Sequence, residues 1–332
     1  MRFEAGENEA GRRLDRVLKK LFRDAPLSLI YRIIRKDVKV NGKRASGETL
    51  LAAGDVVEIL LPEDQLAGLR QEGRPAQPAA RKQFGVVYED ENILVVDKPF
   101  GLLTHGDAAE KKNTLTNQVT GYLAETGAWQ PGGMKTFTPA PANRLDRNTT
   151  GLIPFGKTLP AARDLAIMLQ GGEDGGSYIE KVYLTVVAGG LKAPMTLKAR
   201  MTRDGERNIT KVLDGDSGEG RPMVTEVRPL AEGKGFTLVE ARLLTGRTHQ
   251  IRAQLAEAGF PVIGDRKYGD AETNRMAARR FGLTAQLLHA YRLKVVAVTG
   301  SLGYLMGRTF RAEPPVRFKD IAEALGCGMK MK

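Results

Sequence analysis

The chain has 332 residues, of which 42% are hydrophobic and 27% are charged. The length suggests about two domains. The composition is typical of a folded protein and excludes a wholly disordered chain. The single cysteine, Cys327, excludes an intramolecular disulfide and a cysteine-clustered zinc site, and three histidines far apart in the sequence argue against a histidine-rich metal site. No apolar run reaches the roughly 20 residues of a membrane-spanning helix, and the polar segment 1–10 does not resemble a signal peptide, so we expect a cytoplasmic protein.

The excess of positive charge points to an acidic partner. Lysine and arginine number 51 against 39 aspartates and glutamates, which gives a net charge of +12. Residues 12–44 contain twelve of these cations and only three acids, a local net charge of +9. A polyanion such as nucleic acid would neutralise this segment. Basic composition alone is also found in proteins that bind no nucleic acid, so the clustering is the stronger argument.

The basic segment has the pattern of two short amphipathic helices followed by small strands. Apolar residues repeat at helical spacing over residues 14–21 and again over residues 29–34. An Asn41-Gly42 turn and a strand near residues 55–60 follow. The cations around the helices favour RNA or DNA binding over a merely solvated charged face. The candidate RNA-binding residues are Arg12, Arg13, Arg16, Arg32, Arg35, Lys36 and Lys43.

These motifs resemble the small RNA-binding module first named for ribosomal protein S-four. The resemblance rests on an R-L-D-R-V-L opening that starts at Arg13, a run from Ser28 to Lys43 that ends in V-N-G-K, and a G-D-x-V segment that starts at Gly54. It implies an S-four-like RNA-binding domain over residues 1–60. Residues 61–82 contain prolines, glycines and little periodicity, and this predicts a linker.

From Phe84 onward, strand patterns outnumber helix patterns and do not alternate strictly with them. This favours an α+β fold with a mixed, largely antiparallel sheet over a doubly wound one. We expect this domain to span residues 83–326, with a short tail at 327–332 and a flexible glycine-rich loop at 171–176. Strands are expected at 86–88, 93–96, 181–188, 236–244 and 293–298, and helices at 159–170 and 251–258.

Residues 151–158 match the phosphate-binding pattern G-x-x-x-x-G-K-T, but the context argues against an NTPase. A phosphate-binding loop follows an apolar strand, whereas the preceding residues 143–150 are polar. The backbone N–H groups of such a loop must cradle the phosphates, and Pro154 has no N–H. The Leu-Ile-Pro-Phe segment therefore predicts a buried strand instead.

Two polar runs are candidate functional sites. Asp146 lies between Arg144 and Arg147, and such an arrangement taken alone is most often a structural ion pair. Residues 245–252 (T-G-R-T-H-Q-I-R) end a predicted strand, open a predicted helix and concentrate hydrogen-bond donors that suit an anionic ligand. A helix-capping network explains this second run equally well.

Taken together, these runs resemble the RluA-type pseudouridine synthases, which isomerise uridine in structured RNA. The motifs stand in the family's order over roughly Phe84 to Leu325, and an S-four-like module commonly precedes them. They are D-K-P-x-G at 97–101, R-L-D-x-x-T-S-G-L at 144–152 with threonine in place of serine at position 150, K-x-Y at 181–183, T-G-R-x-H-Q-I-R at 245–252, G-D-x-x-Y-G at 264–269 and L-H-A at 288–290. Three departures are Asn143 where the family often has histidine, Phe260 within the G-H-P segment, and the glycine-rich loop.

The resemblance implies a set of site residues. Asp146 is the expected catalytic carboxylate, Arg247 the buried arginine that keeps it charged, and Tyr183 the residue that stacks on the target base and assists proton removal. Arg144 matches an arginine that inserts where the flipped base was, and a phosphate contact is the alternative for this residue. Independently of the resemblance, His249 is expected to satisfy local hydrogen bonds rather than carry protons. The isomerisation needs no cofactor and no metal.

The expected partner is RNA, with ribosomal RNA favoured over transfer RNA, and a monomer is the default state. The alternative is an inactive RNA-binding or ribosome-assembly factor. The intact Asp146, Tyr183 and Arg247 argue against that alternative, because a degenerate enzyme would be expected to have lost one of them.

Overall fold

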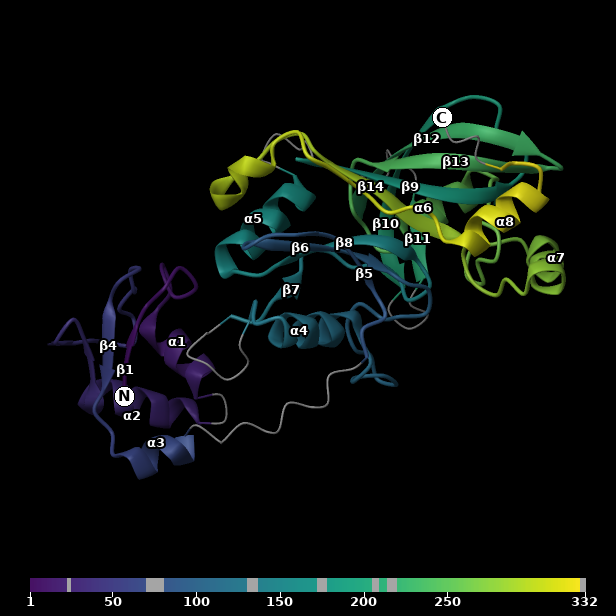
Figure 1. The fold of residues 1–332 in the computed structure, drawn as a ribbon. Helices are drawn as coiled ribbons and strands as arrows, with labels where there is room; N and C mark the ends of the chain where they lie inside the picture. Colours follow the sequence, from purple (N-terminus) through teal and green to yellow (C-terminus); the bar gives the residue numbers. More distant parts are fainter. Residues whose placement is uncertain are drawn as a thin grey trace.

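The computed structural model describes residues 1–22, 25–69, 81–129, 137–171, 178–204, 209–213 and 220–328. Within these residues, a small N-terminal unit is followed by a larger body built on one long sheet (Figure 1). The two parts touch where Asn8 Oδ1 accepts a hydrogen bond of 2.8 Å from the backbone N–H of Leu159. None of the helices in the described ranges is long and apolar enough to cross a membrane.

The N-terminal unit pairs two helices with a four-stranded antiparallel sheet in the order β1-β4-β2-β3. Both predicted apolar stripes lie inside it: Leu14, Val17 and Leu18 of the first helix and Ile30 of the second are fully buried. The predicted pair of helices is therefore confirmed. The elements are β1 (Arg2–Glu4), α1 (Leu14–Leu21), α2 (Leu27–Asp37), β2 (Val38–Val40), β3 (Lys43–Arg44) and β4 (Val56–Ile59).

The structure differs from the expected linker over its first part. Helix α3 (Glu63–Leu69) follows β4, and Leu66 is only 1% exposed because it packs into the N-terminal core. A single buried leucine leaves little periodic signal in a short helix, which is why the sequence did not reveal it. Residues 70–80 of the expected linker lie outside the described residues.

The large sheet has eleven strands, with the order β11-β10-β12-β13-β9-β14-β8-β6-β5 and two short strands, β15 and β7, paired to β14 and β8. Every pairing is antiparallel except β14 with β8, so the predicted mixed, largely antiparallel sheet is confirmed. The strands are β5 (Gly85–Glu89), β6 (Ile93–Lys98), β7 (Ala140–Pro141), β8 (Thr150–Gly156), β9 (Ile179–Ala188), β10 (Met195–Asp204), β11 (Ile209–Leu213), β12 (Arg221–Gly233), β13 (Phe236–Leu243), β14 (Leu288–Val295) and β15 (Thr309–Arg311).

Helices cover both faces of this sheet, as alternating strand residues require. Leu94 and Val96 of β6 pack in one core with helices α4 and α6, whereas Ile93 and Val95 pack in another with α5. Helices α7 and α8 cover a third core with Leu184 of β9. The helices are α4 (Leu115–Glu125), α5 (Leu159–Gln170), α6 (Gln250–Glu257), α7 (Ala271–Phe281) and α8 (Val316–Ala324), with a 3-10 turn at Gly300–Leu305.

The segment that matches the phosphate-loop pattern is a buried strand, as predicted. Every residue of β8 is buried between β6 and β14, and its backbone pairs with β6 from Gly151 to Gly156. Lys157 at its end donates to Glu89 Oε1 at 2.8 Å. Neither the backbone nor this lysine is available to hold phosphates.

The predicted tail at 327–332 is wrong at its first residue, and the predicted glycine-rich loop at 171–176 lies largely outside the described residues. Cys327 was expected in a tail, but it is fully buried in the core with α7 and α8. The body therefore extends to this residue, while residues 329–332 lie outside the described residues. The glycine-rich loop at 171–176 lies outside them too, except for Gly171, which ends α5.

Candidate active site

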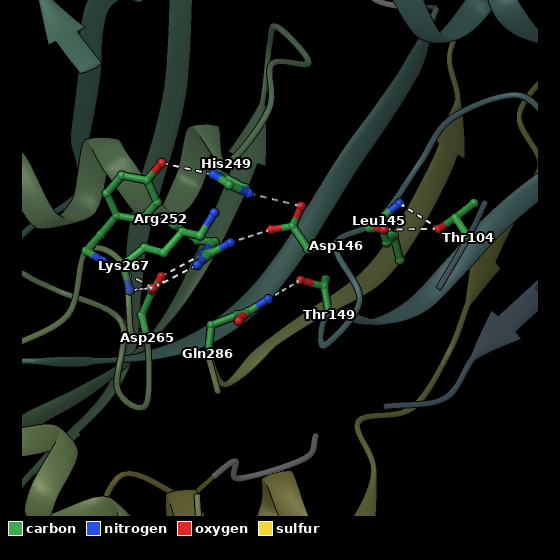
Figure 2. A network of polar contacts seen from close by, with 10 residues as sticks. Thr104, Leu145, Asp146, Thr149, His249, Arg252, Asp265, Lys267 and Gln286 are labelled. Atoms are coloured by element: carbon green, nitrogen blue, oxygen red, sulfur yellow. Dashed lines mark hydrogen bonds and ion pairs between the residues drawn. The ribbon is translucent and has the colours of Figure 1, made fainter. Parts of the chain in front are cut away.

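Asp146 lies in the loop that leads into the central strand β8, and the loop is fixed by buried polar groups. Thr104 Oγ1 accepts from the backbone N–H of Leu145 at 3.3 Å and donates to its carbonyl at 3.0 Å (Figure 2). On the other side, Gln286 Nε2 donates to Thr149 Oγ1 at 3.2 Å. The residues on either side of Asp146 are thereby held, and its side chain is 28% exposed, open enough to meet a ligand.

Lys98 ties the same loop to the turn after β6. Its side chain is fully buried, and Nζ donates to the carbonyls of Arg147 at 2.9 Å, Leu102 at 2.8 Å and Pro99 at 3.1 Å. Burial lowers the pKa of Lys98 to about 7, against the opposing charges of Asp146 and Asp97. The lysine of the D-K-P motif thus has a structural task at the site, which the sequence analysis did not assign.

The ion-pair partner of Asp146 is Arg252, not Arg247. Arg252 Nη1 donates to Asp146 Oδ2 at 2.7 Å, and the remaining edge of the guanidinium makes two bonds to Asp265, Nε to Oδ2 at 2.6 Å and Nη2 to Oδ1 at 2.7 Å (Figure 2). Burial opposes the charge of Arg252, but the hydrogen bonds and charge of Asp265, together with Asp146, outweigh it and raise its pKa. A charged guanidinium is therefore fixed beside the carboxylate.

The helix start explains why the sequence-based choice of arginine was wrong. Helix α6 begins at Gln250, so Arg252 lies on a turn whose residues are buried against the sheet. Arg247 precedes the helix, is half-buried, and directs Nε toward the carbonyl of Pro222 at 3.4 Å. Both arginines belong to the same T-G-R-T-H-Q-I-R run, but only the residue inside the helix reaches Asp146.

Asp265 is the residue that sequence reasoning missed. It is fully buried, and besides Arg252 it accepts from the backbone N–H groups of Lys267 at 2.9 Å and Tyr268 at 3.2 Å. Burial works against its negative charge, but the hydrogen bonds and charge of Arg252, followed by the two backbone N–H groups, lower the pKa of Asp265. A signal was present, because Asp265 is the aspartate of the G-D-x-x-Y-G motif.

Tyr183 and His249 complete the immediate surroundings of Asp146. Tyr183 of β9 is 8% exposed, and burial, together with the negative charge of Asp146, raises its pKa, so its hydroxyl stays protonated. His249 Nε2 lies 3.7 Å from Asp146 Oδ1, and its Nδ1 lies 2.9 Å from the hydroxyl of Tyr268 (Figure 2). The structure therefore brings the predicted Asp146 and Tyr183 into one electrostatic environment.

The remaining predicted residues separate into exposed and paired groups. Arg144 is exposed beside the loop of Asp146. Arg13 donates to Asp15 at 2.8 Å and lies 3.2 Å from Glu48, so its charge already has protein partners. Arg12 is half-buried. The exposed cations of the N-terminal unit include Arg16, Arg32, Arg35, Lys36 and Lys43.

Comparison with known proteins identifies the family of this chain. A family model described as RNA pseudouridylate synthase matches residues 92–257, which contain both Asp146 and Arg252. Ribosomal large subunit pseudouridine synthase C of Vibrio vulnificus (strain CMCP6) is 32% identical over 293 residues, 87% of this chain and 86% of the relative. The protein of that name from Escherichia coli (strain K12) is 33% identical over 303 residues, 86% of each chain.

A third sequence relative and one solved structure also match this chain. Ribosomal large subunit pseudouridine synthase D of Xanthomonas campestris pv. campestris is 30% identical over 317 residues, 93% of this chain and 87% of the relative. The solved structure of human RNA pseudouridylate synthase domain containing 4 superposes with a TM-score of 0.57 at 20% identity, covering 76% of this chain and 96% of that one. The chain belongs to the RNA pseudouridylate synthase family and is an isomerase of that family.

Proposed function

We propose that the protein converts uridines of ribosomal RNA to pseudouridine, with Asp146 as its catalytic carboxylate. The observation that carries the proposal is the buried Arg252 fork, which holds one oxygen of Asp146 at 2.7 Å while the carboxylate stays 28% exposed. A carboxylate that must react needs to be ionised and accessible at once. A positively charged guanidinium is fixed beside one carboxylate oxygen, and the exposure leaves room for a nucleotide.

The chemistry matches what these residues can supply. The bond between ribose C1′ and uracil N1 breaks, a bond from C1′ to C5 forms, and the proton of C5 is lost while N1 gains one. No electrons leave the substrate and no group is transferred to another molecule. Asp146 serves as nucleophile or base, and Tyr183, whose hydroxyl stays protonated, is near enough for the charge of Asp146 to contribute to its raised pKa.

The base must leave the RNA stack to reach Asp146. Arg144 is exposed next to Asp146 and is suited to fill the vacated space or to bind a phosphate. Binding energy would come from exposed cations of the N-terminal unit, because phosphate contacts release counterions from RNA. The S-four-like character of this unit, the monomeric state and the cytoplasmic location stay predictions from the sequence.

Ribosomal RNA is the favoured substrate because three relatives, whose alignments each cover 86% or more of this chain, are named as pseudouridine synthases of the ribosomal large subunit. The direct test uses ribosomal and transfer RNA labelled with tritium at uracil C5, and counts the tritium released to water. We expect release from ribosomal RNA by the wild type and none by Asp146→Asn. Asp320→Asn, at an exposed position of α8, is the matched control and should keep full activity.

The result also decides between the proposal and its alternative. Binding of ribosomal RNA without any tritium release would indicate an inactive assembly factor instead. Release from transfer RNA alone would keep the isomerase and overturn the choice of substrate.

A further inference from the structure

His249 has a left-handed backbone conformation, which is uncommon for residues other than glycine. Its φ is +56°, in the left-handed region, where the described part of the chain has only Asn41 and Lys234 as other non-glycine residues. Those two occupy exposed or half-exposed turns, whereas the His249 side chain is 8% exposed and faces Asp146. A left-handed non-glycine residue at a buried polar site is a sign of a functional constraint on its side chain.

The contacts of His249 determine which ring nitrogen carries the proton. Burial, and then the charges of Arg252 and Lys267, lower its pKa despite the opposing carboxylates of Asp146 and Asp265, so the ring is neutral. The hydroxyl of Tyr268 lies 2.9 Å from Nδ1, and it donates there if Nε2 carries the ring proton. That tautomer points an N–H toward the carboxylate of Asp146, which is the favourable orientation for a neutral ring beside a negative charge.

The two oxygens of Asp146 are thereby made different. Oδ2 receives the hydrogen bond of Arg252 at 2.7 Å, whereas Oδ1 lies 3.7 Å from His249 Nε2, beyond a direct hydrogen bond. Among the described residues, Oδ1 accepts no direct hydrogen bond, so it is the oxygen that keeps acceptor capacity for a ligand. At 3.7 Å the N–H of His249 attracts Oδ1 electrostatically and leaves that oxygen able to accept a hydrogen bond from a ligand.

We propose that His249, held by Tyr268, is a positioning residue that keeps Oδ1 of Asp146 directed toward the incoming nucleotide as the reacting oxygen. The inference rests on the proposed function, because it assigns a part in the same reaction. Tyr268 supports it twice, since its ring also lies against the guanidinium of Arg252, with 5.3 Å between the guanidinium carbon and the ring centre. One tyrosine thus contacts both groups that flank the carboxylate.

The test measures single-turnover tritium release and RNA affinity for the same variants. His249→Ala removes the N–H and should slow release by about 100-fold, the scale of a misplaced reacting group. His249→Gln can place an amide N–H near the former Nε2 and should recover at least a tenfold part of the loss, about 1.4 kcal/mol. RNA affinity and the melting temperature of His249→Gln should stay close to those of the wild type.

Tyr268→Phe keeps the ring and removes only the hydroxyl, so it tests the proposal even where His249→Ala fails to fold. It should slow release by about tenfold at unchanged RNA affinity. Tyr304→Phe is the control. It removes a hydroxyl that lies away from the site and donates to Asp90 Oδ2 at 2.7 Å, and its rate of tritium release should equal that of the wild type. Wild-type rates in Tyr268→Phe, or His249→Gln no faster than His249→Ala, would overturn the inference. A wild type without tritium release would instead overturn the proposed function.

Discussion

Arginine has opposite roles in the two parts of this protein. In the N-terminal unit, Arg16, Arg32 and Arg35 extend from the helices into solvent. In the large body, Arg252 is 5% exposed and lies between the carboxylates of Asp146 and Asp265. The first group leaves its charge available to a partner, and the second uses its charge inside the protein.

The comparison shows why charge counts predict a partner but not a site. Exposed cations act additively, are screened by salt, and can each be replaced at small cost. A buried guanidinium that makes directed bonds to two carboxylates has no substitute of the same geometry, because lysine lacks its planar fork. Removing it also leaves two carboxylates without compensation. Of the three predictions that follow, the first and the last contrast these two situations, and the second concerns a buried group that stays uncharged.

The largest effect is expected at the buried arginine. Arg252→Lys cannot bond Asp146 and Asp265 at once, so single-turnover tritium release should fall by about 1,000-fold. Thermal unfolding should show a loss of roughly 3 kcal/mol, the cost of breaking a buried ion pair. Arg247→Lys, in the same run but half-buried beside Pro222, is the matched control and should lose far less activity. A larger loss in Arg247→Lys than in Arg252→Lys would reverse our assignment.

The second effect concerns a buried group that folding keeps uncharged. His289 is fully buried between Thr150 Oγ1 at 2.8 Å and the carbonyl of Ala312 at 2.7 Å, and burial lowers its pKa from 6.5 to about 4. The unfolded chain then binds a proton more readily than the folded protein between these values. Stability from this group is therefore complete above pH 6.5 and is lost as the pH falls toward 4.

Urea unfolding of the wild type and His289→Gln at pH 7 and pH 4 measures this loss. The wild type should lose roughly 3 kcal/mol more than the variant over this interval, because glutamine does not titrate. Carboxylates that titrate in both proteins cancel in the difference. Parallel curves for the two proteins would show that His289 is protonated equally in the folded and unfolded chains.

The smallest effect is expected at the exposed arginines of α2. If Arg32 and Arg35 each contact a phosphate, changing both to alanine should weaken RNA binding and reduce the slope of log affinity against log salt by about two. The rate of tritium release at saturating protein should not change. The matched control is the double alanine variant of Arg275 and Arg279, two exposed arginines of α7. Equal slopes for the two double variants would remove α2 from the RNA-binding surface.

Much of the fold could be predicted because the signals are local. The apolar repeats of α1 and α2, the paired strands β5 and β6, and the helix at 159–170 all depend on side-chain periodicity within one element. Pro154 and the polar residues before it likewise sufficed to reject a phosphate loop. Helix α3 was missed, since it is short and Leu66 is its buried residue in the N-terminal core, and α4, α7 and α8 were missed as well.

The site residues also separate into those that sequence motifs predicted and those that only packing brings together. The sequence by itself determined that Asp146 and Tyr183 belong to one family pattern, since the order of motifs along the chain carries that information. It did not determine which of two arginines, five residues apart, pairs with Asp146. That choice depends on where α6 begins and on a buried aspartate from a later loop, and both are consequences of packing. Only the tertiary structure brings together Arg252, Asp265 and the left-handed His249, because their contacts join segments that no local pattern connects.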